Sequence, residues 1–269
     1  MTRSLTSALL AGALLGLAAT ATDNASAQSV WMPELTGKGI TLEVLKPLFK
    51  GTDNISFLTS SAFLSFQTPL SSKVCLVADL PFSYAGIRTV HSSVIGNPYL
   101  GIRLGSASRR VSTQLGFRLP VAKVFGSDDF SVGFGFVANP ERWEAFLPDV
   151  ASFNWTVGFN HRRPSGLTVR LRGGPSVLYS RDTKETISTV AYSGLIGYDN
   201  ARIGAGIGFL GQRNSQGGSS SQFGFMVTVP RRRFQPGVVI KFPVGDNFFS
   251  AFVRAIVGVN LSVKLDQGN

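Results

Sequence analysis

The chain has 269 residues, of which 43% are hydrophobic and 15% are charged, and its formal net charge is +11. Charged residues make up about 25% of ordinary soluble domains, so this composition argues against a soluble secreted protein. The single cysteine, Cys75, excludes an intramolecular disulfide framework.

Residues 1–27 have the layout of a secretory signal peptide. Arg3 precedes an apolar run from Leu5 to Ala19, and a cleavage motif of small residues ends at Ala27. A retained membrane anchor is the alternative, but the apolar run is short for a span. We therefore expect an exported protein whose mature domain comprises residues 28–269.

Twelve segments of the mature chain alternate between apolar and polar residues with a period of two, which predicts strands with one apolar face. The last of them is also long enough to cross a tilted bilayer, which takes about 9–11 residues. The predicted strands are Gly39–Phe49, Ile55–Gln67, Lys73–Tyr84, Val94–Gly105, Val111–Pro120, Ala151–Arg163, Leu167–Ser180, Ile187–Tyr198, Ala201–Gly211, Ser221–Pro230, Pro236–Val244 and Ser250–Leu265.

Short and long connections alternate between these strands, as in outer-membrane barrels with short periplasmic turns and longer outer loops. The pattern predicts an all-β fold: an antiparallel, up-and-down transmembrane β-barrel of about twelve strands, in a bacterial outer membrane. A count of fourteen, with Phe130–Ala138 split into further strands, stays open.

The longest connection, Val121–Val150, is too long to lack structure of its own in a compact fold. Asn139, Pro140 and Glu141 supply a cap, a first-turn proline and a first-turn acid. This combination predicts a short helix that continues to Leu147.

The polar phase of the strands would line the interior, and its charges are mostly basic, with only Glu43 and Asp79 as acidic wall candidates. We hypothesise that the long loop folds partly into the lumen, pairs some of the arginines and selects solutes by size and charge. The alternative, a loop that caps the outer face with its acids in water, stays open. The pore-lining candidates are Arg103, Arg118, Arg170, Arg172, Arg202 and Arg254, and the constriction-loop candidates are Asp128, Asp129, Glu141, Glu144 and Asp149.

Catalytic and metal sites are not expected. His91 falls in a predicted outer loop and His161 near the opposite end of the barrel, so they cannot converge on one nucleophile. Neither paired histidines nor clustered cysteines suggest a metal site, and no cofactor is implied. We therefore expect a protein that is not an enzyme.

Two further motifs have structural interpretations. Gly204-x-Gly206-x-Gly208 lacks the strand–turn–helix context of a phosphate loop, and its glycines fall on the inward phase, where they leave space. The run from Arg231 to Arg233 lies in a predicted periplasmic turn, where it can meet anionic headgroups. The net charge is therefore not read as nucleic-acid binding.

Three segments carry a resemblance to a known family: Ala78–Phe82, Ile95–Ile102 and Pro236–Asn247. They are similar to segments of porin-like outer-membrane transporters, grouped with the phenol-degradation and long-chain fatty-acid transport channels. The resemblance implies passive uptake of small hydrophobic or aromatic solutes and transfers no catalytic residue. One departure is the missing terminal aromatic residue, because the last strand ends at Leu265 and four further residues follow.

The expected function is thus a channel or transporter for passive uptake of small solutes, anionic or aromatic, through a cationic lumen. Its expected partners are the lipid bilayer and these solutes. Two alternatives from other classes are an outer-membrane lipid hydrolase or deacylase and a non-conducting structural or surface-interaction barrel.

Overall fold

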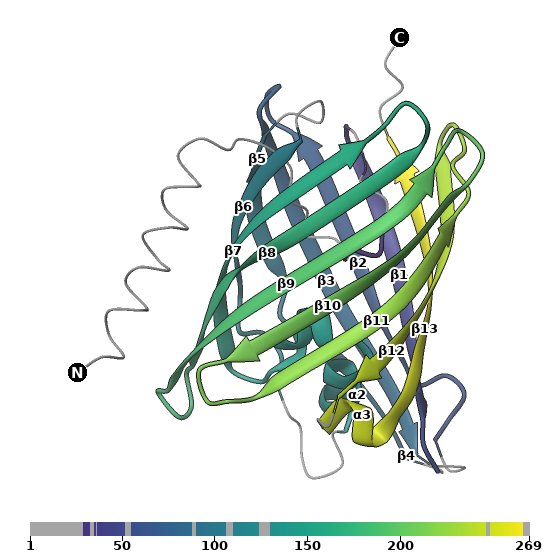
Figure 1. Cartoon of the computed structure of the whole chain (residues 1–269). Helices are drawn as coiled ribbons and strands as arrows, with labels where there is room; N and C mark the ends of the chain where they lie inside the picture. Colours follow the sequence, from purple (N-terminus) through teal and green to yellow (C-terminus); the bar gives the residue numbers. More distant parts are fainter. Residues whose placement is uncertain are drawn as a thin grey trace, which may run out of the picture.

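A computed structural model describes residues 29–32, 35, 37–51, 55–87, 90–105, 110–123, 130–245 and 248–265. Antiparallel strands form one closed barrel, seen from the side in Figure 1. The predicted signal peptide, Asp128 and Asp129, and the four residues after Leu265 lie outside the described residues.

The barrel has twelve strands, one of which is interrupted. The first and last strand segments pair from Gly39↔Lys264 to Phe49↔Val253, which closes the ring. The fourth and fifth both pair with the third and are the two halves of one strand. The segments are β1 Gly39–Phe49, β2 Ser60–Pro69, β3 Val74–Ile87, β4 Val90–Ile95, β5 Tyr99–Leu104, β6 Val111–Arg118, β7 Val150–Arg162, β8 Leu167–Ser180, β9 Thr186–Asp199, β10 Gly204–Asn214, β11 Ser219–Thr228, β12 Phe234–Val244 and β13 Val253–Lys264.

The predicted barrel and its strand count of twelve are therefore confirmed. Two predicted strands, Gly39–Phe49 and Leu167–Ser180, have the observed bounds of β1 and β8. The rival count is wrong, because residues 131–138 form helix α2 (Ser131–Ala138). Below, the end of the barrel with the short connections is the turn end, and the other is the loop end.

The outer face of the strands is apolar and exposed, as a surface in contact with lipid requires. On β8, for example, Leu171 is 52% exposed while Thr168 on the opposite phase is 2% exposed. Thr113, which interrupts the apolar phase of β6, accepts a hydrogen bond from the indole nitrogen of Trp155 at 2.9 Å. Other exposed apolar side chains of this belt are Leu42, Leu64, Leu80, Ile102, Phe117, Phe153, Ile196, Ile207, Phe225, Ile240, Val259 and Leu261.

The long connection between β6 and β7 forms helix α2 and the 3-10 helix η1 (Pro140–Phe146). The predicted short helix after Asn139 is confirmed, with Pro140 in its first turn, but it is a 3-10 helix and the side chain of Asn139 makes no capping hydrogen bond. A third helix, α3 (Phe248–Phe252), precedes β13. No helix in the described part of the chain is long and apolar enough to cross a membrane.

Several predicted strand starts differ from the observed ones, for example Ile55 against Ser60, and two of these errors misplace an arginine. β10 begins at Gly204, because the side-chain oxygen of Asn200 accepts the backbone N–H groups of Arg202 and Ile203 and forms a turn there. Arg202 therefore lies exposed in the turn between β9 and β10, not on the lumen wall.

Arg254 is the second correction. Leu48 pairs with Ala255 and Phe49 pairs with Val253, so Arg254 is the extra residue of a β-bulge. The bulge reverses the phase of the strand: Val253 and Ala255 are buried, while Arg254 is exposed on the outer side. From Val257 onward the predicted phase holds, with Asn260 and Ser262 buried.

Two segments fill the barrel interior, as Figure 1 shows for the helices at the loop end. The first, the amino-terminal segment (described residues 29–32, 35, 37 and 38), leads into β1 from the turn end. The second, the inserted segment (described residues 119–123 and 130–149), enters from the loop end and carries α2 and η1. Trp31 of the first and Phe146 of the second are fully buried in one apolar cluster with inward-facing side chains of the wall.

Candidate functional site

Asn97 holds the inserted segment to the barrel wall. It lies in the break between β4 and β5, where Pro98 supplies no backbone N–H to continue the strand. Its side-chain oxygen accepts the N–H groups of Val121 and Ala122, each at 2.8 Å. Its amide nitrogen donates to the carbonyl groups of Glu144, Leu147 and Val150 at 3.1, 2.7 and 3.2 Å. One buried side chain thus binds both ends of the insertion.

Gly96, next to Asn97 in the sequence, allows η1 to lie close to the barrel wall. The backbone N–H of Asn97 donates to the carbonyl oxygen of Ala145 at 2.6 Å. A Cβ atom on Gly96 would lie 2.4 Å from the same oxygen. Only glycine lets η1 approach the wall this closely.

Glu141 of η1 joins the two segments that fill the lumen. Its carboxylate accepts the hydroxyl of Ser29 and, at 2.9 Å, the backbone N–H of Val30. The same carboxylate lies 3.8 Å from Arg172 of β8.

The amino-terminal segment also contacts the barrel wall directly. The ring of Trp31 occupies the space that Gly208 and Gly224 leave on the wall. Arg170 donates to the carbonyl oxygen of Met32 at 2.9 Å.

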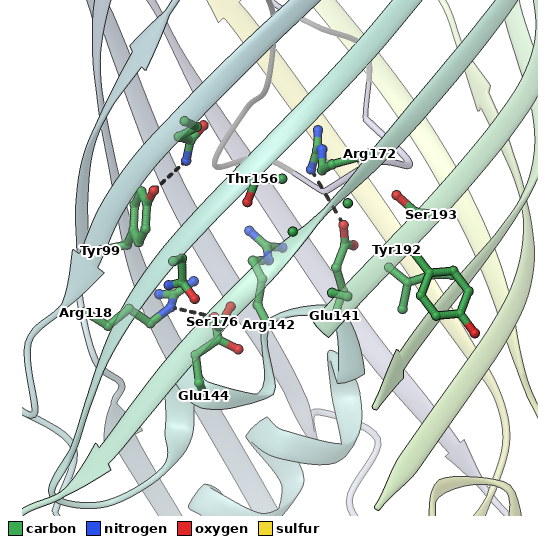
Figure 2. A pocket seen from close by; sticks show the side chains of 16 residues that line it. Tyr99, Arg118, Glu141, Arg142, Glu144, Thr156, Arg172, Ser176, Tyr192 and Ser193 are labelled. Atoms are coloured by element: carbon green, nitrogen blue, oxygen red, sulfur yellow. Dashed lines mark hydrogen bonds and ion pairs between the residues drawn. The ribbon is translucent and has the colours of Figure 1, made fainter. Parts of the chain in front are cut away.

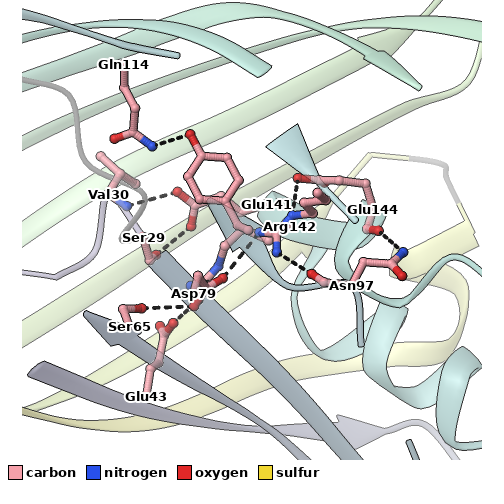
Figure 3. A network of polar contacts seen from close by, with 12 residues as sticks. Ser29, Val30, Glu43, Ser65, Asp79, Asn97, Gln114, Glu141, Arg142 and Glu144 are labelled. Atoms are coloured by element: carbon pink, nitrogen blue, oxygen red, sulfur yellow. Dashed lines mark hydrogen bonds and ion pairs between the residues drawn. The ribbon is translucent and has the colours of Figure 1, made fainter. Parts of the chain in front are cut away.

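Arg142 is the centre of a buried ion network, drawn in Figure 3. Its guanidinium group pairs with Glu43 of β1 and lies 3.7 Å from Asp79 of β3. It also lies over the ring of Phe63, 3.7 Å from the ring centroid. Lys241 of β12, fully buried, lies 3.9 Å from Glu43. Two wall acids thus pair with Arg142 of the insertion, and one of them, Glu43, also lies close to a wall cation.

Arg118, at the loop end of β6, extends the network to Glu144 and Asn97. It lies 3.3 Å from Asp79 and 3.2 Å from Glu144 of η1, and it donates to the carbonyl oxygen of Asn97 at 3.0 Å. Its guanidinium group is 5.4 Å from the ring centroid of Tyr99. Asp79 in turn accepts the hydroxyl of Ser65 at 3.0 Å.

The surroundings of η1 keep Glu141 and Arg142 ionised. Burial alone would raise the pKa of Glu141, but Lys241, Arg172, Arg142 and the hydroxyl of Ser29 lower this pKa below its ordinary value of 4.5. Burial would lower the pKa of Arg142, whereas its acidic neighbours raise it. Both side chains are therefore charged at neutral pH.

A cavity of about 100 Å³ separates η1 from the inner face of strands β5 to β10. Figure 2 shows Glu141, Arg142 and Glu144 projecting toward it from η1, opposite Arg172 and Arg118 of the wall. Gly173 and Gly174 add no bulk to the wall, and Ser176, Ser193 and Thr156 add hydroxyl groups. The cavity is thus a narrow polar space with fixed charges of both signs.

The predicted site residues divide into three groups. Arg103, Arg118, Arg170 and Arg172 lie on the inward phase of their strands. Arg202 and Arg254 do not, for the reasons given above. Of the constriction-loop candidates, Glu141 and Glu144 lie within ion-pair distance of wall arginines. Asp149 is the last residue of the insertion, and its backbone carbonyl oxygen accepts the N–H of Arg181 at 2.9 Å. Asp128 and Asp129 lie outside the described residues.

Sequence analysis missed three residues of the site: Asn97, Arg142 and Lys241. Asn97 had a usable signal, because Gly96 and Pro98 beside it interrupt an alternating strand. Arg142 lies in a loop whose insertion no periodicity reveals. Lys241 falls on the inward phase of β12 and belongs with the other lumen cations.

The two histidines do not converge. His91 of β4 lies 3.1 Å from the hydroxyl of Tyr84 at the loop end, and the two rings stack. His161 lies near the turn end of β7. Among the described residues, no three histidine, cysteine or acidic side chains gather into a group that could hold a metal ion.

The sequence matches no protein-family model and no curated protein. The structure is similar to an outer membrane channel from Pseudomonas putida F1, with 9% identity, a TM-score of 0.62, and coverage of 89% of this chain and 99% of that chain. It is also similar to LpxR from Salmonella typhimurium, with 8% identity, a TM-score of 0.51, and coverage of 84% and 99%. The KdgM porin has 11% identity, a TM-score of 0.50, and coverage of 85% and 99%. The chain therefore has a porin-like outer-membrane β-barrel fold.

Proposed function

We propose that the protein is a bacterial outer-membrane channel for passive uptake of small polar solutes, with a preference for anions. The observation that carries this proposal is the charged cavity between η1 and the wall of a closed barrel whose outer face is apolar. Fixed charges that line such a cavity can select solutes by size and charge.

The preference for anions follows from the charges of the interior. Basic side chains outnumber acidic ones among the described groups that face the lumen away from its rims. The basic groups are Arg103, Arg118, Arg142, Arg170, Arg172 and Lys241, and the acidic groups are Glu43, Asp79, Glu141 and Glu144. Because opposite charges pair around η1, the net charge that a passing ion meets is small and positive.

The reversal potential of residues 28–269 in a planar bilayer, measured across a potassium chloride gradient, tests this proposal. Chloride preference is expected, and Arg172→Gln should reduce it. Arg162→Gln is the matched control, because Arg162 lies at the exposed turn end of its strand, paired with Asp199. Cation preference would overturn the charge selectivity, and a complete lack of conductance would overturn the channel.

We also propose that the protein is not an enzyme, although LpxR shares its fold. The ring of His91 lies within hydrogen-bond distance of the hydroxyl of Tyr84, and the hydroxyl of Ser92 accepts the backbone N–H of Ser131. These contacts give each group a structural role. A lipid-analogue hydrolysis assay on the wild type and His91→Ala tests this, and activity that depends on His91 would contradict it.

A further inference from the structure

A second cavity, of about 380 Å³, opens at the loop end of the barrel. It lies between the three helices on one side and strands β9 to β11 on the other. The described residues that line it include no charged side chain. This volume is within the range of small-molecule sites, roughly 300–1,000 Å³.

Three aromatic side chains form one wall of this cavity. Phe136 of α2 and Phe249 of α3 stack with ring centroids 5.0 Å apart and an interplanar angle of 20°. Trp143 of η1 meets Phe136 edge-on, with centroids 5.4 Å apart. Each helix therefore contributes one ring, and the three rings form a continuous apolar surface.

Uncharged polar side chains form the opposite wall. Thr189 of β9, Gln212 of β10 and Ser220 of β11 all lie on the inward phase and are 5%, 9% and 3% exposed. The hydroxyl groups of Thr189 and Ser220 have no hydrogen-bond partner in the described part of the chain. Buried hydroxyl groups nearly always have a partner in folded proteins, so these two are available to a ligand.

Hydrogen bonds within the chain hold the turn beside the polar wall. The side-chain oxygen of Asn214 accepts the backbone N–H groups of Gln216 and Gly218 at 3.1 and 2.7 Å, which fixes the turn between β10 and β11. Ser215 ties this turn to β9 through Ser188 at 2.8 Å. A preformed wall reduces the ordering cost of binding.

We propose that this cavity binds a free, neutral pyranose sugar ring. The C–H groups on one face of such a ring carry partial positive charge and can pack against the aromatic wall. Its edge carries several hydroxyl groups, which can satisfy Thr189, Gln212 and Ser220 together. A phenol offers one hydroxyl group and would leave most of the polar wall without partners, at a cost for each buried group. An ion would find no countercharge.

Saturation-transfer difference NMR tests this inference, with methyl β-D-glucopyranoside as the probe and phenol as the comparison. The mature protein is kept in a detergent without a sugar headgroup. Thr189→Val and Ser220→Ala should each weaken glucoside binding about threefold to tenfold, the effect of one lost hydrogen bond. Trp143→Ala should abolish the signal from the C–H face of the ring, and Trp143→Phe should restore it.

Ser112→Ala is the matched control, because Ser112 of β6 also has a buried hydroxyl group without a partner among the described residues but does not line the cavity. It should leave binding unchanged. Electrophoretic mobility with and without heating verifies that each variant is folded. Undetectable glucoside binding, equal binding in all variants, or tighter binding of phenol would each overturn the inference.

The NMR experiment does not depend on ion conduction. A barrel that binds the glucoside without conducting would contradict the proposed channel and leave the sugar site intact. A conducting barrel that does not bind the glucoside would contradict the sugar site and leave the proposed channel intact. Each proposal can therefore be disproved without the other.

Discussion

The carboxylate of Glu141 accepts the backbone N–H of Val30 at 2.9 Å, across 111 positions of the sequence. This hydrogen bond joins the amino-terminal segment, which enters the lumen from the turn end, to the inserted segment, which enters from the loop end. The two segments therefore fill the lumen together, and a change at their contact should alter conduction.

Glu141→Ala should raise single-channel conductance. The substitution removes the hydrogen-bond acceptor of Ser29 and Val30 and the ion-pair partner of Arg172. The amino-terminal segment is then no longer bound to η1 and can move out of the path of ions. Glu185→Ala serves as the control, because Glu185 is an exposed acid in the connection between β8 and β9. Equal conductance in both variants would show that Glu141 does not secure the closed state.

Acidic pH should also raise single-channel conductance. The pKa of Glu141 is lowered in the folded state, so its stabilising contribution is complete above the ordinary value of 4.5 and is lost as the pH falls through the lower folded value. Conductance should stay constant from about pH 8 to about pH 5 and rise below 4.5. Glu141→Gln should remove this rise, and a rise that persists in the variant would assign it to another group.

Asn97→Ala should release the inserted segment. The substitution leaves the N–H groups of Val121 and Ala122 and three carbonyl groups without their partner, at about 1–3 kcal/mol for each buried group that water does not reach. Limited proteolysis should then cut between residues 119 and 149, while the barrel stays resistant. Asn97→Asp keeps the acceptor and should give intermediate cleavage. Resistance equal to the wild type would contradict this role.

Arg142→Met should lower the stability of the folded barrel by about 3–5 kcal/mol, because it leaves Glu43 and Asp79 buried without their shared partner. The double variant Arg142→Met, Glu43→Gln should recover part of this loss, since it removes one uncompensated charge. Urea unfolding monitored by tryptophan fluorescence measures both. A double variant less stable than the single one would show that Glu43 is held mainly by Lys241.

The barrel could be predicted from the sequence because its strands have a strict period of two and its connections alternate in length. That signal fails where the period breaks. The bulge at Arg254 reverses the phase within one residue, and the turn at Asn200 removes Arg202 from the wall. Similarly, the strand that breaks at Gly96 and Pro98 alternates on both sides of the break. Its period therefore does not show that Asn97 turns inward, and only the glycine and the proline mark the position.

The contents of the lumen were less predictable, for a different reason. Contacts such as Arg142 with Glu43 join residues 99 positions apart and have no local sequence pattern. Charge balance alone suggested that the acids of the long loop meet the wall arginines. It could not indicate that a basic residue of the same loop would pair with the two acids of the wall.

The position of Ser29 has a consequence for biogenesis. Ser29 is 1% exposed inside the lumen and is held by Glu141. The amino-terminal segment is therefore part of the packing of the lumen and not an appendage of the barrel. Assembly of the barrel is complete only once this segment has entered the lumen and met η1.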